Sequence, residues 1–230
     1  MRFGYGFALL IAAAPALAQV SAAAAPQPPI IYLRDNDTYR LQSDGRFTDE
    51  VEVVKLIKSA QGIKAHGEKQ IGYSESLQSL EILEAYTETA DGKKIVVEKD
   101  KIMTKESPAS ASAPMFSDQK LKVIVFPQVE VGAKLHYHYV RTQKTPLFPG
   151  QFSMIETIAL DVPVEDARKT LIAPKDLQLY IQASEFAGGK TDCPAAEKTN
   201  SAMSGPRRIP RCSRPSRWPS VSSTMVRASP

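Results

Sequence analysis

The sequence predicts an all-β fold, an antiparallel β-sandwich, from three observations. Short runs of alternating apolar and polar residues fill the middle of the chain, and many of the apolar residues are β-branched or aromatic. Turn residues separate these runs at short intervals. No run keeps a 3.6-residue apolar period over a dozen residues, so we expect no long helix. Many short strands without alternating helices are typical of a sandwich or a barrel.

Two Asp-Gly pairs mark the clearest turns. They are Asp44-Gly45 and Asp91-Gly92, where Gly tolerates a positive φ and Asp can bond to the nearby backbone. The 80–87 run tolerates a helix best, because it is rich in Leu, Glu and Ala, but the turn that follows it favours a strand. The expected strands are residues 51–58, 80–87, 95–98, 120–126, 134–140, 154–160 and 177–183.

The N-terminus has the features of a secretory signal peptide over residues 1–18. A basic Met1-Arg2 start precedes an apolar run, and Ala16-Leu17-Ala18 forms a small-x-small cleavage site. The apolar run is too short to span a bilayer, and no later stretch approaches the roughly 20 apolar residues that a spanning helix needs. We therefore expect a periplasmic or secreted protein without a transmembrane segment, with an Ala/Pro linker over residues 19–29.

Composition separates a domain over residues 30–190 from a tail over residues 191–230. The tail holds six prolines, six arginines and eight serines, and its few apolar residues have no period. Such a segment buries too little apolar surface to offset its ordering entropy, so we expect it to be disordered. Two interpretations remain open: a natural basic tail that binds an anionic surface, or a shifted reading frame whose residues were never selected to fold.

The net charge of +4 belongs to the tail. Residues 19–190 carry 21 Lys and Arg against 23 Asp and Glu, whereas residues 191–230 carry 7 against 2. The domain thus lacks the basic excess that collects phosphates, so we expect no nucleic-acid partner.

Few residues point to catalysis. Both cysteines, Cys193 and Cys212, lie in the tail, where an oxidising compartment would permit a disulfide between them. The domain has no Gly-x-Ser-x-Gly elbow and no phosphate-cradling glycine loop. The clustered carboxylates are candidates for acid–base work only by proximity, and we expect them to be solvated surface charges. These carboxylates are Asp35, Asp37, Asp49, Glu50 and Glu52.

His136 and His138 form the sharpest constellation. Residues two apart in a strand point to the same side, so their imidazoles could bind one metal ion if a third ligand converged on it. The alternative is favoured: Leu135, Tyr137 and Tyr139 form the core-facing side, and the two histidines occupy the wetter side. We therefore expect no metal, no cofactor and no catalytic residue, and keep the two histidines as weak metal candidates.

Five aromatic residues near turns or strand ends could bind a sugar or a peptide, although packing explains most such residues. They are Tyr32, Tyr39, Tyr73, Phe116 and Phe148.

A longer pattern runs from about Tyr32 to about Gly188. It comprises Tyr39-x-Leu41, Asp44-Gly45, Lys58-Ser59, Gly62, Tyr73, Leu80-Glu81-Ile82-Leu83-x-Ala85, Asp91-Gly92-Lys93, Pro114-x-Phe116-Ser117-Asp118, Val123-Ile124-x-Phe126-Pro127-x-Val129-x-Val131-Gly132, Tyr137-x-Tyr139, Pro146-x-Phe148-x-Gly150-x-Phe152 and Pro174-x-x-Leu177. In order and spacing, this pattern resembles the N-terminal domain of unknown function (the DUF3857-type domain) that precedes transglutaminase-like domains in exported bacterial proteins.

The resemblance implies a β-sandwich followed by a papain-like transglutaminase or protease domain with a Cys, His, Asp triad. Neither Cys193 nor Cys212 has a histidine downstream, so the triad has no counterpart here. We therefore expect a non-enzymatic accessory module that is truncated before the catalytic domain and whose partner is a protein or peptide. The alternative is a free-standing envelope protein that binds a glycan or a peptide.

Overall fold

The computed structural model describes residues 28–108, 110, 118–156, 162–175, 177, 179–183 and 224–228. These residues form a largely β structure with three sheets and one short α-helix. The predicted signal peptide and most of the predicted tail lie outside the described residues. No helix of the described part is long and apolar enough to cross a membrane.

The largest sheet has six strands and forms one whole layer of the sandwich. In spatial order they are β10 (Ala167–Ile172), β1 (Ile30–Leu41), β2 (Phe47–Ile57), β8 (Lys134–Gln143), β4 (Gln78–Glu88) and β5 (Lys94–Val96). Neighbouring strands are antiparallel except for β1 and β10, which are parallel. The predicted all-β fold is therefore confirmed, and the six-stranded sheet is mixed where a purely antiparallel one was expected.

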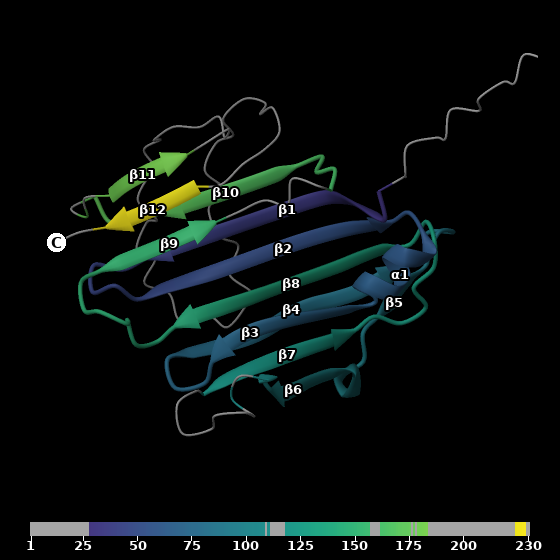
Figure 1. The fold of residues 1–230 in the computed structure, drawn as a ribbon, viewed down its shortest axis with the longest axis horizontal. Coiled ribbons are helices and arrows are strands. Elements are labelled where there is room, and N and C mark those ends of the chain that lie inside the picture. The colour runs from purple at the N-terminus through teal and green to yellow at the C-terminus, as the bar shows by residue number, and fades with distance from the viewer. Residues whose placement is uncertain are drawn as a thin grey trace, which may run out of the picture.

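Two three-stranded antiparallel sheets form the second layer. One consists of β3 (Glu68–Ser74), β7 (Gln119–Val125) and β6 (Ile102–Glu106), in the order β3-β7-β6. The other consists of β11 (Leu179–Ala183), β12 (Thr224–Ala228) and β9 (Phe152–Glu156), in the order β11-β12-β9. In Figure 1, β9, β11 and β12 lie on the β1 side of the molecule, and β3, β7 and β6 lie on the β4 side.

Both small sheets pack on the same face of the six-stranded sheet, here called the inner face. The register places Tyr39 opposite Asp49, two residues before Val51, so the two apolar clusters point the same way. The first cluster lies under β3, β7 and β6, and includes Val51, Val53, Ile71, Leu80, Ile124, Leu135 and Tyr137. The second lies under β9 and β11, and includes Tyr39, Leu41, Phe47, Phe152, Leu171 and Leu179. The opposite, outer face has no second layer among the described residues.

The predicted turns close two hairpins of the six-stranded sheet. Gly45 joins β1 to β2 with a φ of 89°, and Gly92 joins β4 to β5 with a φ of 86°. Only glycine adopts this conformation without strain, which is why the Asp-Gly pairs located both hairpins.

The helix α1 (Ala60–His66) closes one end of the sandwich between β2 and β3. The Ser59 side chain caps it by accepting a hydrogen bond from the Gly62 amide at 3.2 Å. Gly62 is buried against the chain entering β1: a Cβ there would lie 2.2 Å from the carbonyl oxygen of Pro29. The glycine thus permits a close approach between the helix and the first strand.

The tail departs from its prediction at five residues. Thr224–Ala228 form β12, although residues 191–230 were expected to be disordered. This segment pairs on one side with β9 and on the other with β11, so its backbone groups bond to two neighbours. The segment forms a strand because it pairs with two strands that are distant in sequence. Local composition does not reveal such pairing, so it predicted disorder.

Candidate functional site

His136 and His138 lie on β8 with their side chains on the outer face. The alternate residues Leu135, Tyr137 and Tyr139 are buried on the inner face, each at most 9% exposed. The assignment of the two faces of this strand from the sequence is therefore correct.

The two imidazoles face different glutamates. His138 Nε2 lies 3.1 Å from Glu50 Oε1, and His136 Nε2 lies 3.7 Å from Glu88 Oε2. Glu50 sits beyond His138 along β8 and Glu88 sits before His136, so the rings turn away from each other. Among the described residues, no three His, Cys, Asp or Glu side chains are grouped as a metal site requires. The geometry thus gives the weak metal candidates no third ligand in the described part.

His136 is also held by an aromatic neighbour. Its ring stacks on Tyr86 with centroids 4.2 Å apart and planes 13° apart. The ammonium of Lys94 lies 3.7 Å from the centroid of the Tyr86 ring. Burial lowers the pKa of His136, and the charge of Glu88 opposes that shift. Stacking and burial thus make His136 a packed side chain of the outer face.

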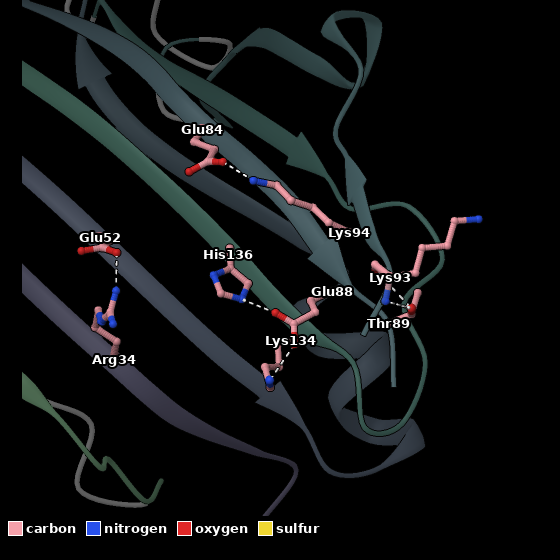
Figure 2. Close-up of polar contacts among 9 residues, drawn as sticks. All are labelled: Arg34, Glu52, Glu84, Glu88, Thr89, Lys93, Lys94, Lys134 and His136. Atoms are coloured by element: carbon pink, nitrogen blue, oxygen red, sulfur yellow. Dashed lines mark hydrogen bonds and ion pairs between the residues drawn. The ribbon is translucent and has the colours of Figure 1, made fainter. Parts of the chain in front are cut away.

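Paired charges flank the histidines on the outer face (Figure 2). Arg34 lies 2.5 Å from Glu52, Lys94 lies 2.5 Å from Glu84, and Lys134 lies 2.7 Å from Glu88. A shallow hollow of about 40 Å³, open to solvent, lies among them. Its lining residues are Glu52, Val53, Glu84, Tyr86, His136, Tyr137 and His138. Exposed pairs of this kind each contribute roughly 0–1 kcal/mol, so the face is polar and close to neutral rather than a strong electrostatic trap.

A second group of charges lies on the inner face, between the two apolar clusters. We call it the inner charged cluster: Asp35, Asp37, Asp49, Arg141, Glu156 and Lys169. Its members come from β1, β2, β8, β9 and β10. It therefore joins the six-stranded sheet to the edge of the β11–β12–β9 sheet.

Lys169 holds the β10 side of this cluster. Its ammonium lies 3.4 Å from Asp35 Oδ1 and also contacts Asp37 Oδ2. Asp37 is 6% exposed, and its Oδ1 has no hydrogen-bond partner. Burial raises the pKa of Asp37 to about 6, although the charge of Lys169 opposes the shift.

Asp49 and Arg141 form the β2–β8 side of the cluster. Asp49 is fully buried and accepts a hydrogen bond from Arg141 at 2.7 Å. Burial raises the pKa of Asp49, and the guanidinium of Arg141 opposes this. Next to this pair, the Tyr39 hydroxyl donates a hydrogen bond to Glu156 of β9.

The inner charged cluster corrects the sequence-based interpretation of Asp37 and Asp49. Both were expected to be solvated surface charges, and both are buried. A signal was present: Asp37 precedes Tyr39 and Leu41 at alternate positions of one strand, so it shares their core-facing side. The cations Lys169 and Arg141 lie 132 and 92 residues away along the chain, and sequence proximity could not reveal these partners.

The loop between β8 and β9 carries an exposed apolar tip. Leu147 is 71% exposed and Phe148 is 62% exposed. The flanking backbone is held by hydrogen bonds: the Gly150 amide donates to the Asp44 carbonyl at 3.1 Å, and the Lys144 amide donates to the Leu77 carbonyl at 2.8 Å. We call residues 144–151 the Leu147–Phe148 loop. It presents two large apolar side chains from a fixed base at one end of the six-stranded sheet.

The family comparison decides which group of proteins this fold represents. A family profile described as a domain of unknown function with a solved structure, DUF3857, matches residues 43–202. This chain belongs to the DUF3857 family. The resemblance to the DUF3857-type domain, predicted from the sequence, is thereby confirmed for the domain itself. No functionally curated protein matches the sequence.

Solved structures confirm the fold of this DUF3857 domain. A putative protease from Parabacteroides distasonis superposes with a TM-score of 0.66 at 17% identity, over 88% of this chain and 41% of that chain. The chain thus spans less than half the length of that protein. An M1 zinc metallopeptidase from Deinococcus radiodurans matches 87% of this chain and 39% of its own, with a TM-score of 0.32 and 8% identity. A TM-score that low carries no argument.

The remaining sequence candidates of the DUF3857 domain divide between core and surface. Tyr39 is buried, and Tyr32 and Tyr73 pack against the first apolar cluster. Among the four of these aromatics that the structure describes, Phe148 is the exposed one. Phe116, Cys193 and Cys212 lie outside the described residues.

Proposed function

We propose that this chain is a non-enzymatic module that binds a polypeptide and works beside a catalytic domain. The observation that carries this proposal is the Leu147–Phe148 loop. The fold supplies a rigid support, and the ligand is an apolar stretch of another protein. Its export through residues 1–18 is part of the same proposal.

The loop has the properties of a binding anchor. Two neighbouring large apolar side chains, both more than half exposed, retain apolar surface that a partner could remove from water. The backbone hydrogen bonds at Gly150 and Lys144 fix the loop before binding, so less conformational entropy is lost on association. Interface energy concentrates in a few such well-placed residues.

The module role draws on the longer relative. The fold recurs within a Parabacteroides distasonis protein whose name is putative protease, and this chain spans 41% of its length. The sequence pattern also resembles the domain that precedes transglutaminase-like domains. Together these support a domain that presents a substrate or contacts a neighbouring catalytic domain.

A free-standing glycan-binding protein is the second candidate function. Phe148 and Tyr180 are exposed aromatic residues, and sugars stack on such rings. They lie on different elements, the Leu147–Phe148 loop and β11, and no ring contact joins them in the described part, whereas Leu147 and Phe148 are neighbours on one loop. This arrangement favours a polypeptide over a glycan.

Selection from a displayed peptide library on the immobilised full chain tests the proposal. We expect enrichment of peptides with apolar residues, lost when Leu147→Ser and Phe148→Ser are combined. Leu83→Ser is the matched control, because Leu83 is 48% exposed on β4. Enrichment that survives in the double variant would refute the anchor. Binding to a glycan array that depends on Phe148 would favour the second candidate.

A turnover assay tests the non-enzymatic part separately. We expect the purified chain neither to cleave labelled casein nor to transfer an amine to it, with or without a reducing agent. Thiol-dependent proteolysis or transamidation by this chain would overturn that part of the proposal.

A further inference from the structure

Two lysines from opposite layers of the sandwich meet over one aromatic ring. Lys55 of β2 and Lys69 of β3 each place their ammonium 5.6 Å from the centroid of the Tyr137 ring. The ammonium of Lys55 also lies 5.0 Å from the centroid of the Tyr32 ring. The two positive charges therefore converge on an aromatic floor.

A third basic side chain stands beside this pair. His66, the last residue of α1, has its pKa lowered by burial and also by the charges of Lys55 and Lys69. The carboxylate whose charge acts on Lys55 is Asp35, and that group already lies 3.4 Å from Lys169. Asp37 also acts on Lys69, and Lys169 pairs with both aspartates. Three lysines against two carboxylates leave this corner with an excess of positive charge.

Lys55 is buried without a polar partner. It is 6% exposed, and no hydrogen bond or ion pair joins it to a residue of the described part. Its ammonium nitrogen is not among the fully buried polar atoms, so it keeps some contact with solvent. An ammonium held largely out of water is disfavoured unless a negative group compensates it. Accordingly, burial lowers the pKa of Lys55 to about 8, with repulsion from Lys69 adding to the shift.

Packing alone explains this arrangement poorly. An aromatic ring attracts a cation only modestly, and it satisfies none of the three donors of an ammonium. A structural lysine would also be expected alone, whereas here a second lysine faces the same ring. Lys69 is half-buried on β3, an edge strand of its sheet, which leaves an approach from solvent.

We propose that Lys55 and Lys69, with His66 beside them, form a binding site for a carboxylate group of a ligand. A carboxylate would bridge the two ammoniums and offset their repulsion. With Lys169, Asp35 and Asp37 counted, one positive charge remains to be balanced, which suits a monoanion better than a phosphate dianion. The site lies towards the end of β2 opposite the Leu147–Phe148 loop, so it does not depend on the proposed polypeptide anchor.

Side-chain NMR of lysines in the full chain tests this site with acetate as the probe. At matched ionic strength, we expect acetate but not chloride to raise the pKa of Lys55 by about 1 unit or more, saturably. Lys69→Met should abolish the acetate effect. Lys134→Met, on the outer face, should leave it intact. Because Lys69 is half-buried, its variant should fold even if Lys55→Met does not.

Two results would overturn the site, and a third would refute its preference for a carboxylate. The pKa of Lys55 would be the same in acetate and chloride, or the acetate shift would persist in Lys69→Met. Inorganic phosphate saturating the shift at a lower concentration than acetate would refute the preference for a carboxylate. Loss of peptide binding at the Leu147–Phe148 loop would leave these readouts unchanged, so the two proposals fail separately.

Discussion

Asp49 shows what a single buried charge demands from its surroundings. It is fully buried, and Arg141 is its ion-pair partner at 2.7 Å. We predict that Arg141→Met lowers the free energy of unfolding by about 3 kcal/mol, because it leaves the buried carboxylate of Asp49 without its cationic partner. Urea unfolding measures the change. Arg34→Met is the control: its pair with Glu52 is exposed, so the loss should stay below about 1 kcal/mol. Equal effects of the two variants would contradict the role of burial.

The raised pKa of Asp37 predicts how the stability of the fold depends on pH. Its pKa is about 6 in the folded chain and 3.8 without the fold, so the folded state binds the proton more tightly. Its contribution to the free energy of unfolding therefore rises as pH falls from 7 to 5, by about 1 kcal/mol. His66 and His136, whose pKa values are lowered, act in the opposite direction.

The contribution of Asp37 is read from the difference between the wild type and Asp37→Asn. Urea unfolding at pH 7 and pH 5 should show the wild type gaining about 1 kcal/mol relative to the variant. A constant difference between the two proteins over this pH range would show that Asp37 is not the group responsible.

The same residues mark the limit of sequence reasoning at this scale. Asp35 and Asp37 lie in a polar stretch whose nearby cations, Arg34 and Arg40, pair with Glu52 and Glu50 instead. The local sequence therefore offers the two aspartates no cation on their own side of the strand. Lys169 provides that cation only after β10 has paired with β1. By contrast, the faces of β8 follow from alternation within a single strand, and the assignment of His136 and His138 was correct.

At the scale of elements, Gly62 shows a conflict between helix propensity and packing. Alanine favours a helix over glycine by about 1 kcal/mol, yet a Cβ at this position would lie 2.2 Å from the Pro29 carbonyl oxygen. We predict that Gly62→Ala lowers the free energy of unfolding by about 1–3 kcal/mol. The control is Gly72→Ala on β3, whose nearest neighbour, a Leu121 methyl, lies 3.8 Å away. Thermal melting that ranks Gly62→Ala at or above wild type would contradict this account.

The strands found from sequence are those with local signals. The runs expected at 51–58, 80–87, 95–98, 120–126 and 134–140 correspond to β2, β4, β5, β7 and β8. β1 was missed because its centre, Arg34 to Thr38, is polar, and its charges are satisfied by long-range partners. β3, β6 and β10 were missed because their buried sides are short or interrupted by charge. Their strand structure depends on neighbours from distant parts of the chain.

At the scale of the whole molecule, the β11–β12–β9 sheet depends on residues 224–228. β9 and β11 each pair with β12 and not with each other. We predict that a chain ending at residue 190 loses hydrogen-exchange protection in β9 and β11 while β2 and β8 stay protected. Mass-spectrometric exchange of the full and shortened chains makes the comparison. Unchanged protection of β9 would mean that β12 does not hold this sheet together.

We propose that the fold holds the Leu147–Phe148 loop rigidly as a polypeptide-binding anchor. The most direct measurement is the Kd of a library-selected peptide for the wild type, for Phe148→Ala and for Leu83→Ala, by fluorescence anisotropy. We predict that Phe148→Ala weakens binding at least about tenfold, whereas Leu83→Ala changes the Kd less than about twofold. Equal affinity of the wild type and Phe148→Ala would contradict it.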